Sequence, residues 1–140
     1  MATFNKYNCF VENLAEKVHN LQSDTLKVAL TNTAPTAADT VWNTTVYPAP
    51  VAANGYTAGG NSLTVSSSSQ TSGTYKLVIA DTVFTATSGG IGPFRYVVLY
   101  NSTASGAVIG YYDYGSSITL ADTETFTVDF DAANGVLTIA

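Results

Sequence analysis

An alternation of apolar and polar residues with a period of two runs through most of the chain from Thr25 onward. It is clear in 26–30, where Leu, Val and Leu alternate with Lys and Ala, and again in 126–130, where Phe, Val and Phe alternate with Thr and Asp. Successive side chains of a β-strand point to opposite faces, so this period indicates strands with one buried face. The alternation predicts a mainly β chain.

Gly-rich and Ser-rich turns divide this pattern into short strands. The expected ranges are 25–31, 40–46, 62–66, 74–80, 83–86, 94–100, 107–114, 117–120, 125–130 and 136–139. We expect the turn at 131–135 to join the last two strands into a hairpin. Many short strands without alternating helices predict an antiparallel β-sandwich or jelly roll.

Two segments depart from this pattern. In 4–21 the large apolar residues fall within one arc of about 140° when placed at about 100° per residue, which predicts an N-terminal amphipathic α-helix. The stretch 32–60 contains Pro35, Pro48 and Pro50, each of which lacks the N–H that a strand ladder needs, so we expect an irregular arm there. The 140 residues are expected to form a single domain, 1–140, with the β-sandwich over about 25–140.

Composition and charge exclude several classes of protein. Charged residues make up 11% of the chain, while 21 Thr and 12 Ser give it a hydroxyl-rich surface. Ten acidic residues outnumber five basic ones, and no Lys or Arg follows Arg95. Nucleic-acid binding requires clustered Lys and Arg, so no nucleic-acid partner is expected. The longest apolar run, 96–100, is far below the ~20 residues that span a membrane, so no membrane partner is expected either.

The residues that perform chemistry are few. On a helix over 4–21, Cys9 and His19 would lie about 15 Å apart along the axis, too far to share a metal ion or to act as nucleophile and base. His19 is expected to be solvated and Cys9 to be a small filler at the edge of the apolar stripe. Asp113, between tyrosines, is the one carboxylate in an unusual setting, and nothing in the sequence identifies the second carboxylate that a glycosidase would need. We therefore expect no enzyme, no metal and no cofactor.

Aromatic residues and arginine make up the candidate contact surface. Tyr, Trp and Arg dominate binding hot spots because each buries a large area and still offers a polar group. The candidate partner-binding residues are Trp42, Tyr47, Arg95, Tyr111, Tyr112 and Tyr114. Alternation should turn half of the strand tyrosines into the core. After Lys27 only Lys76 is available to protect a strand edge with a lysine, so we also expect an edge to be covered by another subunit.

Three segments carry a resemblance to a known family. They are GPFRYVVLYN at 92–101, GYYDYGSSITL at 110–120 and ETFTVDF at 124–130, and the opening 1–32 accompanies them. With them the whole chain resembles virion proteins of tailed bacteriophages, in particular the capsid cement (decoration) proteins, of which a Bordetella phage carries one. The matching motifs are structural, so no functional residue is carried over.

The resemblance implies a jelly-roll fold and a structural role in the virion. It implies homodimers on the outer face of the capsid, where they clamp neighbouring subunits of the major capsid protein and stabilise the mature shell. The first 25 residues lack the pattern of a signal peptide, which predicts synthesis in the cytoplasm of the host bacterium. The main alternative is a tail or surface adhesion module that binds host glycan through its tyrosine-rich strands. A plain structural subunit of the tail or baseplate is a third reading.

Overall fold

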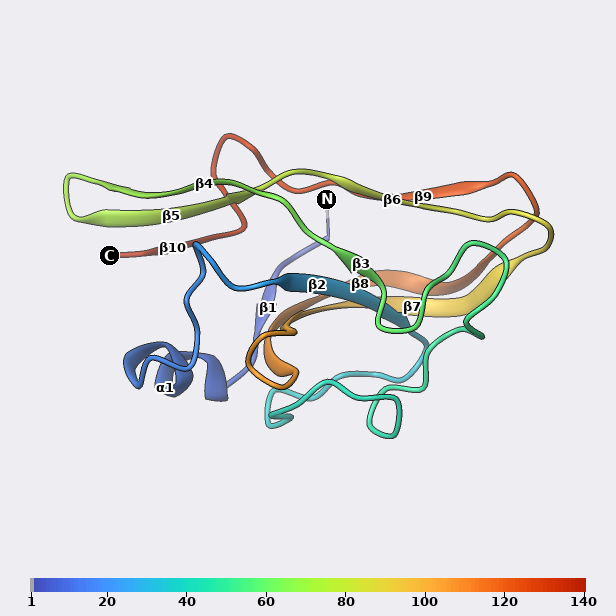
Figure 1. The fold of residues 1–140 in the computed structure, drawn as a ribbon, viewed down its shortest axis with the longest axis horizontal. Coiled ribbons are helices and arrows are strands. Elements are labelled where there is room, and N and C mark those ends of the chain that lie inside the picture. Colours follow the sequence, from blue (N-terminus) through green and yellow to red (C-terminus); the bar gives the residue numbers. More distant parts are fainter. Residues whose placement is uncertain (1) are drawn as a thin grey trace.

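The computed structural model describes residues 2–140, which form antiparallel β-sheets and one short helix. The largest sheet has the order β1 (Asn5–Lys6), β8 (Ala107–Leu120), β7 (Ile91–Asn101), β2 (Leu26–Thr31) and β3 (Asn61–Ser62). A second sheet has the order β10 (Leu137–Ile139), β5 (Thr74–Ile79) and β4 (Val65–Thr71), and a third pairs β6 (Thr82–Thr85) with β9 (Thr125–Val128). The two smaller sheets lie side by side above the large one (Figure 1), an arrangement consistent with a β-sandwich.

The main core lies between these two layers. On β2, Leu26, Val28 and Leu30 point into it, as the alternation predicts, and all are at most 1% exposed. Phe84 of β6 meets them from the upper layer and is 1% exposed. Burying such a side chain contributes about 1.5–3 kcal/mol, before the entropy of ordering it is subtracted. The packing of the two layers therefore fixes the positions of β7 and β8.

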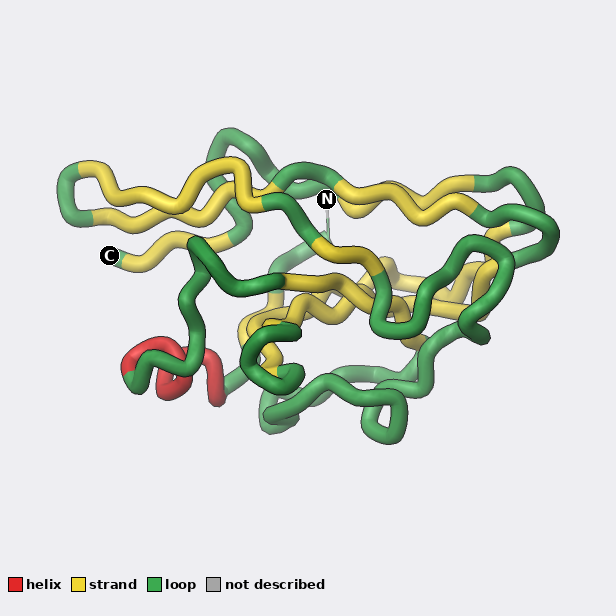
Figure 2. The backbone as a smooth tube through the Cα atoms, in the orientation of Figure 1, coloured by secondary structure: helices red, strands yellow, loops and turns green. Residues whose placement is uncertain are grey.

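The outer face of the large sheet is also buried. The arm 32–60 runs below this sheet as a long loop (Figure 2). The one isolated β-bridge among the described residues joins Val41 of the arm to Ala107 of β8. A second apolar cluster forms between the arm and the sheet, and it consists of Tyr7, Ala29, Tyr47, Val98, Tyr100 and Val108. The central strands β2 and β7 thus bury both of their faces.

The helix is much shorter than the predicted 4–21, and that prediction is wrong in its bounds. The only helix among residues 2–140 is α1 (Cys9–Ala15). Before it, Asn5 and Lys6 pair with β8 as strand β1. After it, Lys17 has a left-handed backbone (φ 65°), and the N–H of Val18 bonds back to Asn13, which ends the helix. Tyr7, Phe10 and Leu21 are buried from three different local conformations instead of one helical face, while Val11 and Val18 are exposed.

The predicted C-terminal hairpin is also wrong. A turn does form at Asp131, whose carboxylate accepts the N–H groups of Ala133 and Asn134 at 2.9 and 2.8 Å. However, β9 pairs with β6 and β10 pairs with β5, and the two do not pair with each other. Because β5 and β6 follow one another in the chain, β10 and β9 pair with adjacent segments. Residues 129–136 form the loop between β9 and β10, opposite residues 78–81. The turn residues specify only a local reversal of the chain. The strands with which β9 and β10 pair are set by the β5–β6 segment.

Four further details differ from the expected strands. The range 40–46 forms no strand beyond the bridge of Val41, and the two ranges expected at 107–120 are one continuous strand, β8. The range expected at 62–66 is divided between β3 and β4. Irregular pairing between Phe94 and Tyr96 places Phe94 in the main core with Val97 instead of on the face of Val98.

Candidate functional site

The tyrosines of β8 are divided between the two faces of the large sheet. Tyr111 faces the arm, where its ring lies 5.3 Å from that of Tyr7. Tyr112 and Tyr114 face the upper layer, where they meet Phe130 and Phe126. The alternation predicts this division, although the sequence does not say which residues lie opposite.

Tyr112 and Tyr114 line an open groove between β8 and β9, which we call the β8–β9 groove. Its volume is about 400 Å³, and its walls are formed by Ala2, Val97, Tyr112, Tyr114, Phe126, Thr127, Val128 and Asp129. The ring of Phe126 lies between two others, with its centroid 5.0 Å from that of Phe94 and 5.7 Å from that of Tyr114. Tyr114 is 54% exposed, so the groove presents a large aromatic surface to solvent.

The lining of this groove also includes polar groups. Burial raises the pKa of Tyr112 to about 12, so its hydroxyl stays protonated at neutral pH and can donate a hydrogen bond. Thr127 and Asp129 of the β9 segment add a hydroxyl and a carboxylate. A mainly apolar lining with a few polar groups is typical of a protein contact site. The arrangement has the features needed to bind a partner side chain.

Arg95 and Asp113 form an ion pair on the opposite face of β8. The guanidinium Nε and Nη2 donate to the two carboxylate oxygens at 2.7 and 2.9 Å. The hydrogen bond from Arg95 is the largest influence on Asp113 and, with the N–H of Gly115, holds the pKa of this carboxyl below its ordinary value. Asp113 therefore stays ionised, which is the opposite of what a general acid requires. Arg95 is occupied by its own chain and lies over the ring of Tyr96.

Tyr47 lies inside the protein, which corrects its prediction as a contact residue. It is 1% exposed, and its hydroxyl donates to the carboxylate of Asp39 and lies 3.1 Å from the hydroxyl of Tyr7. Its role is to anchor the arm on the sheet. Trp42 is half-buried and stacks on Tyr100 with ring centroids 4.4 Å apart.

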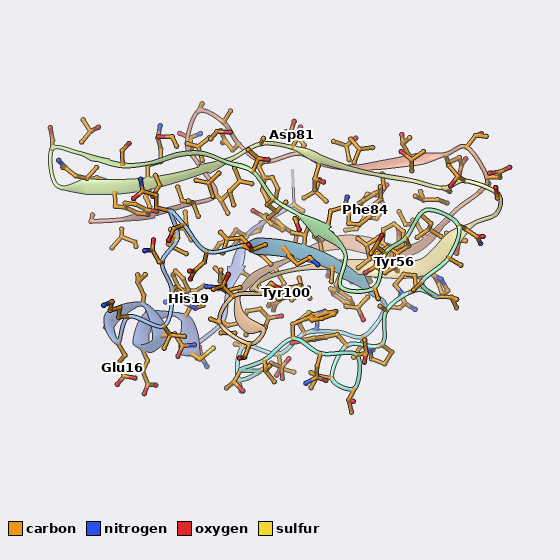
Figure 3. The ribbon with its side chains drawn as sticks, viewed as in Figure 1. Glu16, His19, Tyr56, Asp81, Phe84 and Tyr100 are labelled. Carbon is orange, nitrogen blue, oxygen red and sulfur yellow. The ribbon has the colours of Figure 1, made fainter. Side chains whose placement is uncertain are left out.

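His19 is buried, so its expected solvation is wrong. It is 5% exposed and lies in the connection between α1 and β2 (Figure 3). Burial lowers the pKa of its imidazole, although the nearby Asp24 opposes this effect. Cys9 is half-buried, and its thiol faces the carbonyl oxygens of Asp39 and Val108 at 3.6 and 3.9 Å. Burial raises the pKa of this thiol.

The structure thus brings two of the six predicted residues, Tyr112 and Tyr114, into one groove. The other four, Trp42, Tyr47, Arg95 and Tyr111, lie outside it. It adds Phe126, which the sequence analysis missed as a contact residue. The aromatic residues alternating along β9 were visible in the sequence, but nothing local indicates that they face β8. Within residues 2–140, no three His, Cys, Asp or Glu side chains are grouped closely enough to hold a metal ion. The same residues contain no helix with the length and apolar character needed to cross a bilayer.

Comparison with known proteins identified no relative, since no protein family, no curated protein and no solved structure matches the chain.

Proposed function

We propose that the protein is a capsid decoration protein, which binds the outside of a phage head as a homodimer and clamps neighbouring major capsid protein subunits. The β8–β9 groove carries this proposal. Tyr114 is 54% exposed beside the half-buried ring of Phe126, and an open aromatic groove of this composition can accept an anchoring side chain from a partner protein. The resemblance of the β7, β8 and β9 segments to decoration proteins supports the choice of partner.

Charge gives a further property of that partner. The acidic residues Asp122, Glu124 and Asp129 are exposed and lie in or next to the β9 segment. No Lys or Arg follows Arg95, which is itself paired with Asp113. A capsid surface that places an apolar side chain in the groove, with Lys or Arg beside it, would complement this region.

The proposed dimer uses an edge strand. At one edge of its sheet, β4 runs for seven residues and carries no charge and no proline. The other outer strands are shorter, with β1 and β3 at two residues each. An uncharged exposed edge is a template for pairing with another strand. We place the homodimer contact there, and the jelly-roll form of the sandwich belongs to the same proposal.

Stabilisation of the shell follows from mass action. A ligand that binds the expanded shell and not its dissociated subunits stabilises the shell by RT ln(1 + [L]/Kd). A dimer that reaches two capsid subunits makes its second contact intramolecular, so modest contacts give high avidity. Many copies on one head would then resist the outward pressure of packaged DNA.

The test is to mix purified protein with expanded heads that lack decoration. We expect a fixed copy number per head and a higher temperature of head disruption. Tyr114→Ala should weaken head binding by roughly tenfold to a hundredfold, because hot-spot truncations cost about 1–3 kcal/mol. Val51→Ala is the control, since Val51 is 81% exposed in the arm and lies away from the groove. Equal loss in both variants, or no binding by the wild-type protein, would overturn the proposal.

The adhesion module remains the competing function, and the exposure of Tyr114 is the observation that favours it. An exposed tyrosine ring offers a flat apolar face on which a sugar ring can stack. Titration with host-surface oligosaccharides separates the two functions. Saturable binding that Tyr114→Ala abolishes, together with no affinity for heads, would support the adhesin.

A further inference from the structure

A second site lies on the other face of the large sheet, away from the β8–β9 groove. A pocket of about 440 Å³ opens where the arm meets the 102–106 loop. Its walls are formed by Lys27, Trp42, Thr44, Ala58, Gly59, Tyr100, Ser102, Ser105 and Gly106. Tyr100 lies on this side of the sheet (Figure 3). We call this space the Trp42 pocket.

The aromatic wall of the Trp42 pocket is held rigidly. The rings of Trp42 and Tyr100 stack at 4.4 Å with an interplanar angle of 12°, and the Tyr100 hydroxyl donates to the carbonyl of Gly59 at 2.7 Å. The backbone N–H of Trp42 donates to the carbonyl of Gly106 at 2.8 Å. The indole Nε1 is buried and has no hydrogen-bond partner among residues 2–140. The wall is therefore preorganised and leaves one donor unused.

Lys27 supplies a positive charge without a counter-ion. Of the other cations, Arg95 pairs with Asp113, Lys76 donates to the carbonyl of Ala133 at 2.9 Å, and Lys6 and Lys17 are exposed at the surface. Lys27 is half-buried on β2, and no carboxylate lies within 4.0 Å of it among the described residues. In a chain with net charge −5, an unpaired lysine that lines a pocket with Trp42 and Tyr100 is suited to an anion.

The rim keeps space open beside this charge. Gly59 has a left-handed backbone (φ 86°), and a Cβ there would lie 3.1 Å from the Tyr100 hydroxyl and 3.4 Å from Lys27 Nζ. A side chain at 59 would therefore fill the mouth. Ser102 and Ser105 add exposed hydroxyl-bearing residues to the rim.

We propose that the Trp42 pocket binds a hexuronic acid residue, a sugar that carries a carboxylate, within an acidic polysaccharide. The apolar face of the sugar ring packs against Trp42, the carboxylate pairs with Lys27 and the ring hydroxyls bond to the serine rim. Ligand pockets combine this kind of aromatic surface with a few placed polar groups. The site is separate from the β8–β9 groove, and the inference does not depend on capsid binding.

The chain provides its own probe, because Trp42 is its only tryptophan. We expect its fluorescence to change saturably on titration with a trisaccharide of α-1,4-linked galacturonic acid. The same trisaccharide with galactose in place of galacturonic acid should bind about tenfold more weakly or worse, since it lacks the carboxylate. Added salt should weaken the binding of the acidic trisaccharide and leave the binding of the neutral one unchanged, because salt screens charge pairs.

Three variants complete the test. Lys27→Gln should reduce affinity for the acidic trisaccharide by about tenfold or more, while Lys76→Gln should leave it unchanged. Trp42→Phe removes the fluorophore, so sugar binding to this variant is measured by the amide NMR shifts of Ser102 and Ser105. Equal binding of the two sugars, an unaffected Lys27→Gln, or no saturable change up to about 10 mM sugar would each overturn the inference.

Discussion

The side-chain amide of Asn101 holds His19 in one tautomer. Asn101 Nδ2 donates to His19 Nδ1 at 3.1 Å and to the Asp24 carboxylate at 2.6 Å. The amide cannot be reversed, because its oxygen accepts the N–H of Ala104 at 3.1 Å. His19 Nδ1 is therefore an acceptor, and the imidazole is neutral.

This geometry predicts that the protein loses stability in mild acid. Burial places the pKa of His19 below its ordinary value of 6.5, so the unfolded chain takes up a proton at a higher pH than the folded chain. The stabilisation is complete above about pH 6.5 and is lost as the pH falls from there through the folded pKa. Urea unfolding at pH 7.5, 6.5 and 5.5 measures this loss.

His19→Gln is the variant that isolates the effect, since its amide oxygen can still accept from Asn101. We expect a lower unfolding free energy than wild type at pH 7.5, by about 1–3 kcal/mol for the lost packing against Phe10 and altered polar contacts. Between pH 7.5 and 5.5 its stability should fall less than that of the wild type. Parallel pH profiles for the two proteins would contradict the role of His19.

Tyr47→Phe should destabilise the arm. Without this hydroxyl, the buried Tyr7 hydroxyl loses its partner and Asp39 loses a hydrogen bond. Leaving a buried polar group unpaired costs about 1–3 kcal/mol. Thermal unfolding should shift down accordingly, while Tyr114→Phe, at a 54% exposed position, should change little. A Tyr47→Phe protein as stable as wild type would show that the arm does not depend on this anchor.

Arg95→Ala should change the titration of Asp113 more than the fold. The hydrogen bond from Arg95 is the main reason that the Asp113 pKa is low, so its removal should raise this pKa toward the ordinary value of 3.8. The N–H of Gly115, 2.8 Å from the carboxylate, should keep part of the shift. Carboxyl carbon NMR across pH 2–6 measures this. An unchanged Asp113 titration would mean that the pair does not persist in solution.

The parts of the fold that the sequence predicts are those set by local alternation. The period of two correctly assigns Leu26, Val28 and Leu30 to the core, because β2 is regular and its inner face is fully covered. It fails at Phe94, where irregular pairing with β8 shifts the face. The turn at Asp131 was predictable from its residue types, but the pairing of the flanking strands depends on residues 74–85, far away in the chain.

The candidate site was predictable only in part, for the same reason. The division of Tyr111 and Tyr112 between two faces follows from alternation. The burial of Tyr47 does not, because the arm has no periodicity and its position depends on Tyr7 and Asp39. The pairing of Tyr114 with Phe126 likewise requires the packing of two separate sheets.

The uncharged edge of β4 leads to the last prediction. Ser67 and Ser69 are exposed on this strand, and lysine at a sheet edge opposes pairing with another strand. The double variant Ser67→Lys and Ser69→Lys should keep the circular dichroism spectrum of the wild type and sediment as a monomer at concentrations where the wild type is dimeric. Ser23→Lys with Ser116→Lys is the matched control, because both residues are exposed outside β4 and the net charge changes equally. A wild type that is monomeric at high concentration would show that this dimer does not form. A dimer that persists in the Ser67→Lys and Ser69→Lys variant would place the subunit contact outside β4.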